Sequence, residues 1–156
     1  FKIARNHIHH EQIGTVMDIY STIVDASNSS SPSKHPVDGV SLLPQLSGKS
    51  NKERPDHFMC HFPHSHRSSY FTSFRKGDWK LIYRYLTTSG KRKSKQPLPK
   101  YELYHLKNDP YETKNLAPKN SRKTNEMIRL MTEQLARENA LFPVQDGIEL
   151  RPQLIN

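Results

Sequence analysis

The sequence has few features that would anchor or cross-link it. Its 156 residues include a single cysteine, Cys60, which excludes an internal disulfide and leaves the redox compartment open. No apolar run approaches the roughly 20 residues of a membrane-spanning helix. The amino terminus lacks the basic and then apolar pattern of a signal peptide. Because the first residue is Phe1 rather than Met, we expect a piece of a longer protein, and the compartment stays unknown.

The sequence also lacks the short motifs of common catalytic sites. It has no glycine-rich phosphate loop, no Gly-x-Ser-x-Gly elbow and no pair of carboxylates in an evident catalytic setting. The net charge of +9 permits a polyanionic partner such as nucleic acid or a sulfated glycan. We favour a solvated basic surface, because the charge is spread along the chain rather than striped along one element. The most basic stretch lies between Thr87 and Lys100 and lacks interleaved aromatic residues.

A hairpin around Gly77 and Asp78 is the most distinct local feature. The two residues separate runs rich in aromatic and β-branched side chains. Gly at the first position of a two-residue loop is typical of a type II′ hairpin, because that position needs a positive φ. This loop would pair Lys76 with Trp79 and Phe74 with Leu81. Alternation would place five large side chains on one face of the sheet: Phe74, Trp79, Leu81, Tyr83 and Tyr85.

Further elements flank the hairpin. Residues 58–63 and 101–106 have strand-like composition, and a helix capped by Asn120 or Ser121 would run to about Asn139. Its apolar stripe is Met127, Ile128, Met131 and Leu135. These elements predict an α+β fold, in which a small antiparallel sheet of three to four strands packs with a carboxy-terminal amphipathic helix.

An earlier helix is predicted from Thr15, which can cap it, to about Asp25. Its apolar residues recur at helical spacing, and such a stripe is typical of a core-facing helix. The stripe consists of Val16, Ile19, Tyr20, Ile23 and Val24.

Histidines crowd around Cys60, at positions 57, 61, 64 and 66. They invite a zinc hypothesis, but the spacing matches no paired Cys-x-x-Cys or His-x-x-x-His frame. A Cys60–His61 nucleophile pair is disfavoured, because neighbours in a strand point to opposite faces. His61 and His64, at a strand end and in the following loop, could offer imidazoles to an anionic ligand. Ordinary polar histidines are the competing interpretation.

The order of these segments resembles the carboxy-terminal part of a known family. DIYSTIVD, DGVSLLPQLSG and MCHFPHSH are followed by FRKGDWKLIY, ELYHLKNDPYETKNLA and an amphipathic helix. This series is similar to the type I, formylglycine-dependent sulfatases of the alkaline-phosphatase-like superfamily, and it extends from about Val16 to Phe142. The most specific part is the combination of FRKGDWKLIY with ELYHLKNDPYETKNLA.

The resemblance implies a division of the chain. Residues 1–48 would be the end of the large catalytic α/β domain, with its last helix and exit segment. Residues 49–156 would form the carboxy-terminal sulfatase subdomain. The helix after Val16 would then expose, in isolation, surface that the full enzyme covers.

The resemblance also implies cofactors that lie outside this chain. The family uses a formylglycine made within a Cys/Ser-x-Pro-x-Arg motif and a calcium ion held by aspartates and an asparagine, all upstream. Cys60 does not match the motif, because Pro63 stands at the third following position and no arginine stands at the fourth. We therefore assign no catalytic residue and no metal ligand here. The segment His61–His64 would lie near the mouth of the cleft, so His61 and His64 are the candidate substrate-binding residues.

The expected function is that of a carboxy-terminal portion of a sulfatase, which completes the fold and shapes the substrate cleft but has no turnover alone. The implied partners are the missing amino-terminal catalytic portion and a sulfated small molecule or glycan, with nucleic acid disfavoured. The family implies a secreted, periplasmic or lysosomal location. One alternative is a phosphodiesterase or phosphonate hydrolase of the same superfamily. The other is a stand-alone basic module that binds a sulfated glycan or nucleic acid.

Overall fold

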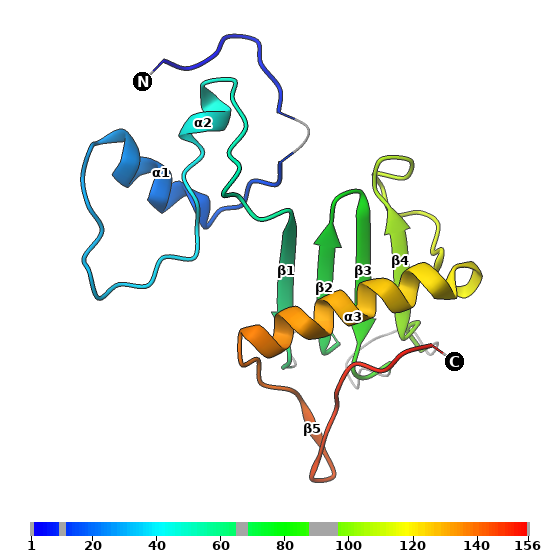
Figure 1. The fold of residues 1–156 in the computed structure, drawn as a ribbon. Coiled ribbons are helices and arrows are strands. Elements are labelled where there is room, and N and C mark those ends of the chain that lie inside the picture. The colour runs from blue at the N-terminus through cyan, green and yellow to red at the C-terminus, as the bar shows by residue number, and fades with distance from the viewer. Residues whose placement is uncertain (1, 10–11, 65–68, 88–96, 156) are drawn as a thin grey trace. The chain divides into compact units, whose positions relative to one another are not determined.

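The structure is a computed structural model that describes residues 2–9, 12–64, 69–87 and 97–155 (Figure 1). The chain forms two compact units, unit 1 at Phe1–Asp56 and unit 2 at His57–Asn156. His10, His66 and the basic residues 91–95 lie outside the described residues. The division at residue 48 that the resemblance implies concerns a longer enzyme, and it stays a prediction.

Unit 2 is built on a four-stranded antiparallel sheet. The strands are β1 (His57–Phe62), β2 (Phe71–Lys76), β3 (Trp79–Arg84) and β4 (Tyr101–His105), and they neighbour one another in chain order. Each strand therefore pairs with the next through a local connection, and the predicted α+β fold with a small antiparallel sheet is confirmed.

The hairpin between β2 and β3 has the predicted register. Lys76 lies opposite Trp79 and Phe74 lies opposite Leu81. Gly77 has a φ of +55°, the left-handed value that the first loop position of a type II′ turn requires. Phe74 and Leu81 are 2% and 0% exposed, so the face that alternation predicted is the face that packs.

Helix α3 (Ser121–Arg137) covers this face of the sheet (Figure 1). It follows a short 3₁₀ turn, η1 (Ala117–Lys119). The Asn120 side chain caps the helix by accepting a hydrogen bond from the backbone N–H of Lys123 at 3.1 Å. The predicted stripe of α3 is fully buried and packs with residues of the sheet: Met127, Ile128, Met131, Leu135, Phe74, Leu81, Tyr83 and Leu103.

The outer edge of β4 is closed by a side chain. Asn115 Oδ1 accepts hydrogen bonds from the backbone N–H groups of Leu103 at 3.0 Å and Ala117 at 2.9 Å. Its amide nitrogen donates to the carbonyl of Tyr101 at 3.0 Å. Asn115 thus satisfies backbone groups that an edge strand would otherwise leave open.

A second hairpin follows α3, with strands β5 (Val144–Gln145) and β6 (Ile148–Glu149). Asp146 and Gly147 have φ values of +51° and +79°, as a type I′ turn requires. The dipeptide Asp-Gly at this turn is itself a sequence signal for a two-residue hairpin.

Unit 1 contains the helices α1 (Asp18–Ala26) and α2 (Leu43–Leu46). The prediction that Thr15 caps α1 is wrong, since no side chain caps the helix at its first residue. Instead, the Asp18 carboxylate accepts a hydrogen bond from the backbone N–H of Thr15 at 2.7 Å. Within this chain the stripe of α1 does not face a core, because Val16 and Ile23 are 82% and 61% exposed. This is the exposure that the resemblance implies for the helix in isolation.

Asp18 and Arg54 form the centre of unit 1. They are 3% and 8% exposed, and Arg54 Nη1 lies 2.9 Å from Asp18 Oδ2. Asp18 also accepts from the N–H of Val40 at 2.9 Å, and Arg54 donates to the carbonyls of Ile13, Val40 and Ser41. The pair therefore ties the start of α1 to the segments at residues 13, 40–41 and 54. We call it the Asp18–Arg54 clasp.

Candidate functional site

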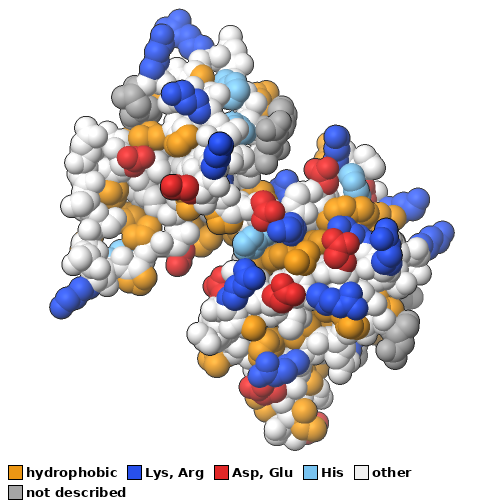
Figure 2. Space-filling view, in the orientation of Figure 1, with side chains coloured by type: hydrophobic (Ala, Val, Ile, Leu, Met, Phe, Trp, Pro, Cys, Tyr) orange, Lys and Arg blue, Asp and Glu red, His pale blue; other side chains and the backbone are white. Residues whose placement is uncertain are grey.

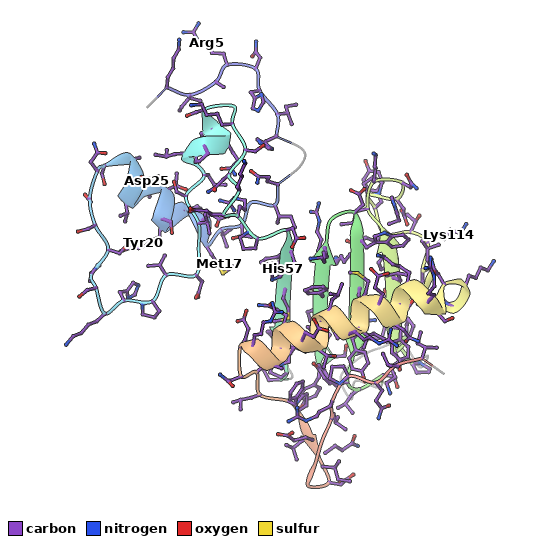
Figure 3. The ribbon with its side chains drawn as sticks, viewed as in Figure 1. Arg5, Met17, Tyr20, Asp25, His57 and Lys114 are labelled. Carbon is purple, nitrogen blue, oxygen red and sulfur yellow. The ribbon has the colours of Figure 1, made fainter. Side chains whose placement is uncertain are left out.

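The two predicted site residues lie at the end of β1 and just beyond it. In the strand register, His61 stands opposite Thr72 and Met59 stands opposite Phe74. His61 is therefore on the face of the sheet that packs. His64 follows Pro63 and is exposed. Figure 3 labels His57, where β1 begins.

Both ring nitrogens of His61 have partners within unit 2. Nε2 lies 2.7 Å from the carbonyl oxygen of Leu141, and Nδ1 lies 2.7 Å from Thr72 Oγ1. Thr72 Oγ1 lies 2.8 Å from the Tyr85 hydroxyl. A carbonyl only accepts, so Nε2 carries a hydrogen, and a neutral ring then accepts at Nδ1. For a neutral His61 ring, Tyr85 donates to Thr72, Thr72 donates to His61 Nδ1, and His61 Nε2 donates to the carbonyl of Leu141.

Aromatic rings enclose this network. The His61 ring meets the rings of Tyr85 and Phe142 edge-on, at centroid distances of 6.0 Å and 5.9 Å. Burial raises the pKa of Tyr85 to about 12, although the hydrogen bond with Thr72 acts in the opposite direction. Tyr85 is therefore a neutral phenol at ordinary pH, and its hydroxyl can either donate to or accept from Thr72 Oγ1.

His64 has a different setting. Its ring lies over the ring of Phe62 at a centroid distance of 4.0 Å, and Phe62 stacks on Phe71 at 5.7 Å. Phe62 and Phe71 are cross-strand partners, and alternation places Phe62 on the face of the sheet opposite His61. The two predicted residues thus differ in their surroundings. Both ring nitrogens of His61 form hydrogen bonds within unit 2, whereas the ring of His64 is exposed to solvent.

The described part of the chain holds no group of three or more His, Cys, Asp or Glu residues that could bind a metal ion. Cys60 is exposed, and its cross-strand partner is Ser73, so alternation turns it away from His61. Within the described residues, no helix combines the length and the apolar character needed to cross a membrane.

Sequence reasoning missed the partners of His61. Thr72 faces His61 through the register of β1 on β2, and the sequence does not fix that register, because no short turn joins the two strands. Leu141 lies 80 residues away along the chain and contributes a backbone carbonyl, which no side-chain pattern indicates.

With this geometry in place, comparison with known proteins decides the family. A family model described as "N-sulphoglucosamine sulphohydrolase, C-terminal" matches residues 2–140. The chain belongs to this family. The resemblance to the carboxy-terminal part of the sulfatases, drawn from the sequence, is thereby confirmed.

Solved structures similar to this member of the sulphohydrolase C-terminal family include sulfatases. One is a putative sulfatase from Bacteroides thetaiotaomicron, with 25% identity and a TM-score of 0.58. Another is BT1596, described as a 2-O GAG sulfatase, with 25% identity and a TM-score of 0.57. A third, BT4656, was solved in complex with its substrate D-glucosamine-2-N,6-O-disulfate and has 25% identity and a TM-score of 0.56. Each match covers 78% of this chain and 24% of the other, so the chain spans about a quarter of these relatives.

The phosphonate monoester hydrolase of Agrobacterium radiobacter shares the fold, with 20% identity, a TM-score of 0.50, and coverage of 78% of this chain and 24% of that one. No curated protein matches the chain.

Proposed function

We propose that this chain is the carboxy-terminal part of a sulfatase that hydrolyses a sulfate ester of a sugar. The observation that carries the proposal is the family match over residues 2–140. The sugar is favoured because BT4656 binds a sulfated glucosamine and BT1596 is described as a GAG sulfatase. A formylglycine and a calcium ion would supply the nucleophile and the Lewis acid from a portion outside this chain.

The exposed stripe of α1 supports a larger assembly with an amino-terminal catalytic portion. Ile19, Tyr20 and Ile23 are 54%, 43% and 61% exposed, and Val16 beside them is 82% exposed. The one buried residue of the helix is Asp18. Helix α1 therefore packs against unit 1 through its polar side and exposes its apolar side. This arrangement favours a further part of the protein that packs over the apolar stripe.

Within that enzyme, His64 and His61 would contribute to the substrate cleft in different ways. His64 would contact an anionic substrate group directly, because its imidazole is exposed and lies in tilted contact with the ring of Phe62. For His61 to do so, it would have to release a hydrogen bond to Thr72 or Leu141. We therefore propose His64 as the direct contact and His61 as a residue that positions the end of β1.

The test is sulfate release by the full-length protein from D-glucosamine-2-N,6-O-disulfate, with a phosphonate monoester as the competing substrate. Release of sulfate with little phosphonate cleavage supports the proposal. Preferential cleavage of the phosphonate would move the assignment to the related hydrolases, whose likeness to this chain is one of fold.

The role of the histidines is tested on the same protein. We expect His64→Ala to raise KM for the sulfated sugar by about tenfold with little change in thermal stability, since one charge-assisted contact is worth about 1.5 kcal/mol. Tyr85→Phe is the matched control for His61, because it removes one hydrogen bond of the network while keeping the aromatic ring beside His61 and both histidines. If His61→Ala and Tyr85→Phe both lower stability and leave KM alone, His61 has a structural role only.

A further inference from the structure

A basic hollow in unit 1 contains none of the residues proposed for the substrate cleft. It is an open depression with a volume of about 870 Å³, and ligand pockets typically measure roughly 300–1,000 Å³. Two short segments, 2–5 and 47–49, line it. The lining residues are Lys2, Ile3, Ala4, Arg5, Ser47 and Lys49.

Local backbone contacts hold the two segments together. The N–H of Ala4 donates to the carbonyl of Leu46, at the end of α2, at 2.7 Å. Gly48 has a φ of +80°, and a Cβ built there would lie 3.4 Å from the Cβ of Ala4. The turn after α2 therefore runs close against the amino-terminal segment. As a result, residues from both segments line one hollow.

Among the residues that the structure describes, these cations have no partner of opposite charge. No ion pair there involves Lys2, Arg5 or Lys49, and none of the described lining residues is a carboxylate. By contrast, Arg54, Lys80 and Arg84 all pair with carboxylates of this chain. The three cations are exposed, so solvent screens their repulsion, but their shared positive potential attracts an anion.

Blue side chains of lysine and arginine gather over the amino-terminal segment and α2 in Figure 2, and Figure 3 labels Arg5 on that segment. Ser47 adds a hydroxyl that can donate to an oxyanion. The hollow is far larger than one sulfate ion. Its size and its charges suit a ligand that presents several anionic groups on a polar scaffold.

We propose that this hollow, which we call the Lys2–Arg5–Lys49 site, binds sulfate groups of a sulfated oligosaccharide. The choice of a sulfated sugar rests on the proposed function, whereas the anion site itself rests on the geometry of unit 1. The site would bind the sulfate groups of a sugar chain electrostatically. We expect no catalysis there, because its lining offers cations and a hydroxyl but no pair of acidic and basic groups.

The experiment measures binding to the full-length protein by calorimetry. The probes are a heparin tetrasaccharide, its desulfated counterpart, sodium sulfate and a single-stranded DNA 20-mer. One variant carries Lys2→Ala, Arg5→Ala and Lys49→Ala. The matched control carries Lys34→Ala, Lys52→Ala and Lys107→Ala, which removes the same charge from three exposed lysines elsewhere. Lys49→Glu is a second variant with one substitution, and thermal melts verify that each protein is folded.

We expect the triple variant to weaken tetrasaccharide binding by about tenfold or more, and the control to weaken it by less than about twofold. The slope of log K against log salt should become shallower by about two in the triple variant only. Desulfated sugar should bind no variant measurably. Equal losses in the triple variant and its control, or wild-type affinity in the triple variant and Lys49→Glu, would overturn the site.

Tighter binding of the DNA than of the tetrasaccharide would overturn the sulfated sugar as ligand. Binding of sodium sulfate as tight as that of the tetrasaccharide would overturn the multi-sulfate mode. These readouts do not depend on turnover. A protein that releases no sulfate yet binds the tetrasaccharide through these cations would contradict the proposed function and leave this site standing.

Discussion

Removal of the Asp18 carboxylate should unfold unit 1 while leaving unit 2 folded. In Asp18→Ala, Arg54 remains buried without its counter-charge, and breaking a buried ion pair in this way costs about 3–5 kcal/mol. The N–H groups of Thr15 and Val40 also lose their acceptor. At roughly 0.05–0.15 kcal/mol per residue, a unit of this length has a free energy of unfolding of about 3–8 kcal/mol. The loss is therefore comparable with the whole stability of unit 1.

The measurement is amide hydrogen exchange followed by mass spectrometry, which resolves the two units by peptide. We expect peptides from residues 12–56 to exchange quickly in Asp18→Ala, while peptides from α3 keep their protection. Asp25→Ala is the control, because Asp25 is exposed and accepts one hydrogen bond, from Ser41 Oγ at 2.7 Å. Wild-type exchange of residues 12–56 in Asp18→Ala would refute the inference that the clasp holds unit 1 together.

The clasp also predicts the direction of an acid response. Burial acts to raise the pKa of Asp18, but hydrogen bonds from the N–H groups of Val40 and Thr15, together with Arg54, hold the pKa below the ordinary value of 3.8. A carboxyl whose pKa is lower in the folded state contributes stability that is fully present above its unfolded pKa and is lost as the pH falls through the folded pKa. Exchange of unit 1 should therefore rise below about pH 4 in the wild type. This component should be absent in Asp18→Asn.

Three further substitutions test the packing. Asn115→Ala should lower the free energy of unfolding of unit 2 by about 2–3 kcal/mol in urea titration, because two backbone N–H groups lose their acceptor; Asn115→Asp, which keeps an acceptor, should lose less. Gly39→Ala should disrupt unit 1 in the exchange experiment, because the new Cβ would lie 2.1 Å from the carbonyl oxygen of Met17, whereas Gly14→Ala should be tolerated. Met131→Ala should cost about 2–5 kcal/mol in unit 2, since Met131 is 0% exposed in the core, and a cost below 1 kcal/mol would contradict the packing described.

The sequence predicted unit 2 well because its signals are local. The register of β2 on β3 follows from the two-residue loop at Gly77, and the period of the apolar residues in α3 fixes the face that packs. The cap at Asn120 lies within one turn of its donor, Lys123 N–H. None of these features requires knowledge of a distant residue.

The site was less predictable because its contacts are long-range. The composition of the segment His61–His64 indicates polar histidines, but only the register and the path of the chain after α3 bring Thr72 and Leu141 to the ring of His61. The same holds for the clasp in unit 1, where Arg54 reaches an aspartate 36 positions earlier in the chain. A pattern in sequence can indicate that a polar residue is suited to a buried role, but the partner that makes the burial possible comes from tertiary structure.

The stripe of α1 shows what helical periodicity can and cannot predict. The spacing of Ile19, Tyr20 and Ile23 predicts an apolar helix face, and that face exists. Periodicity does not say which atoms lie against it, and in this chain the face is exposed. Asp18, on the same helix, is buried because its charge is fully engaged by Arg54 and two N–H groups. The helix is thus fixed from its polar side by this chain, which leaves the apolar side available to the rest of the enzyme that we propose.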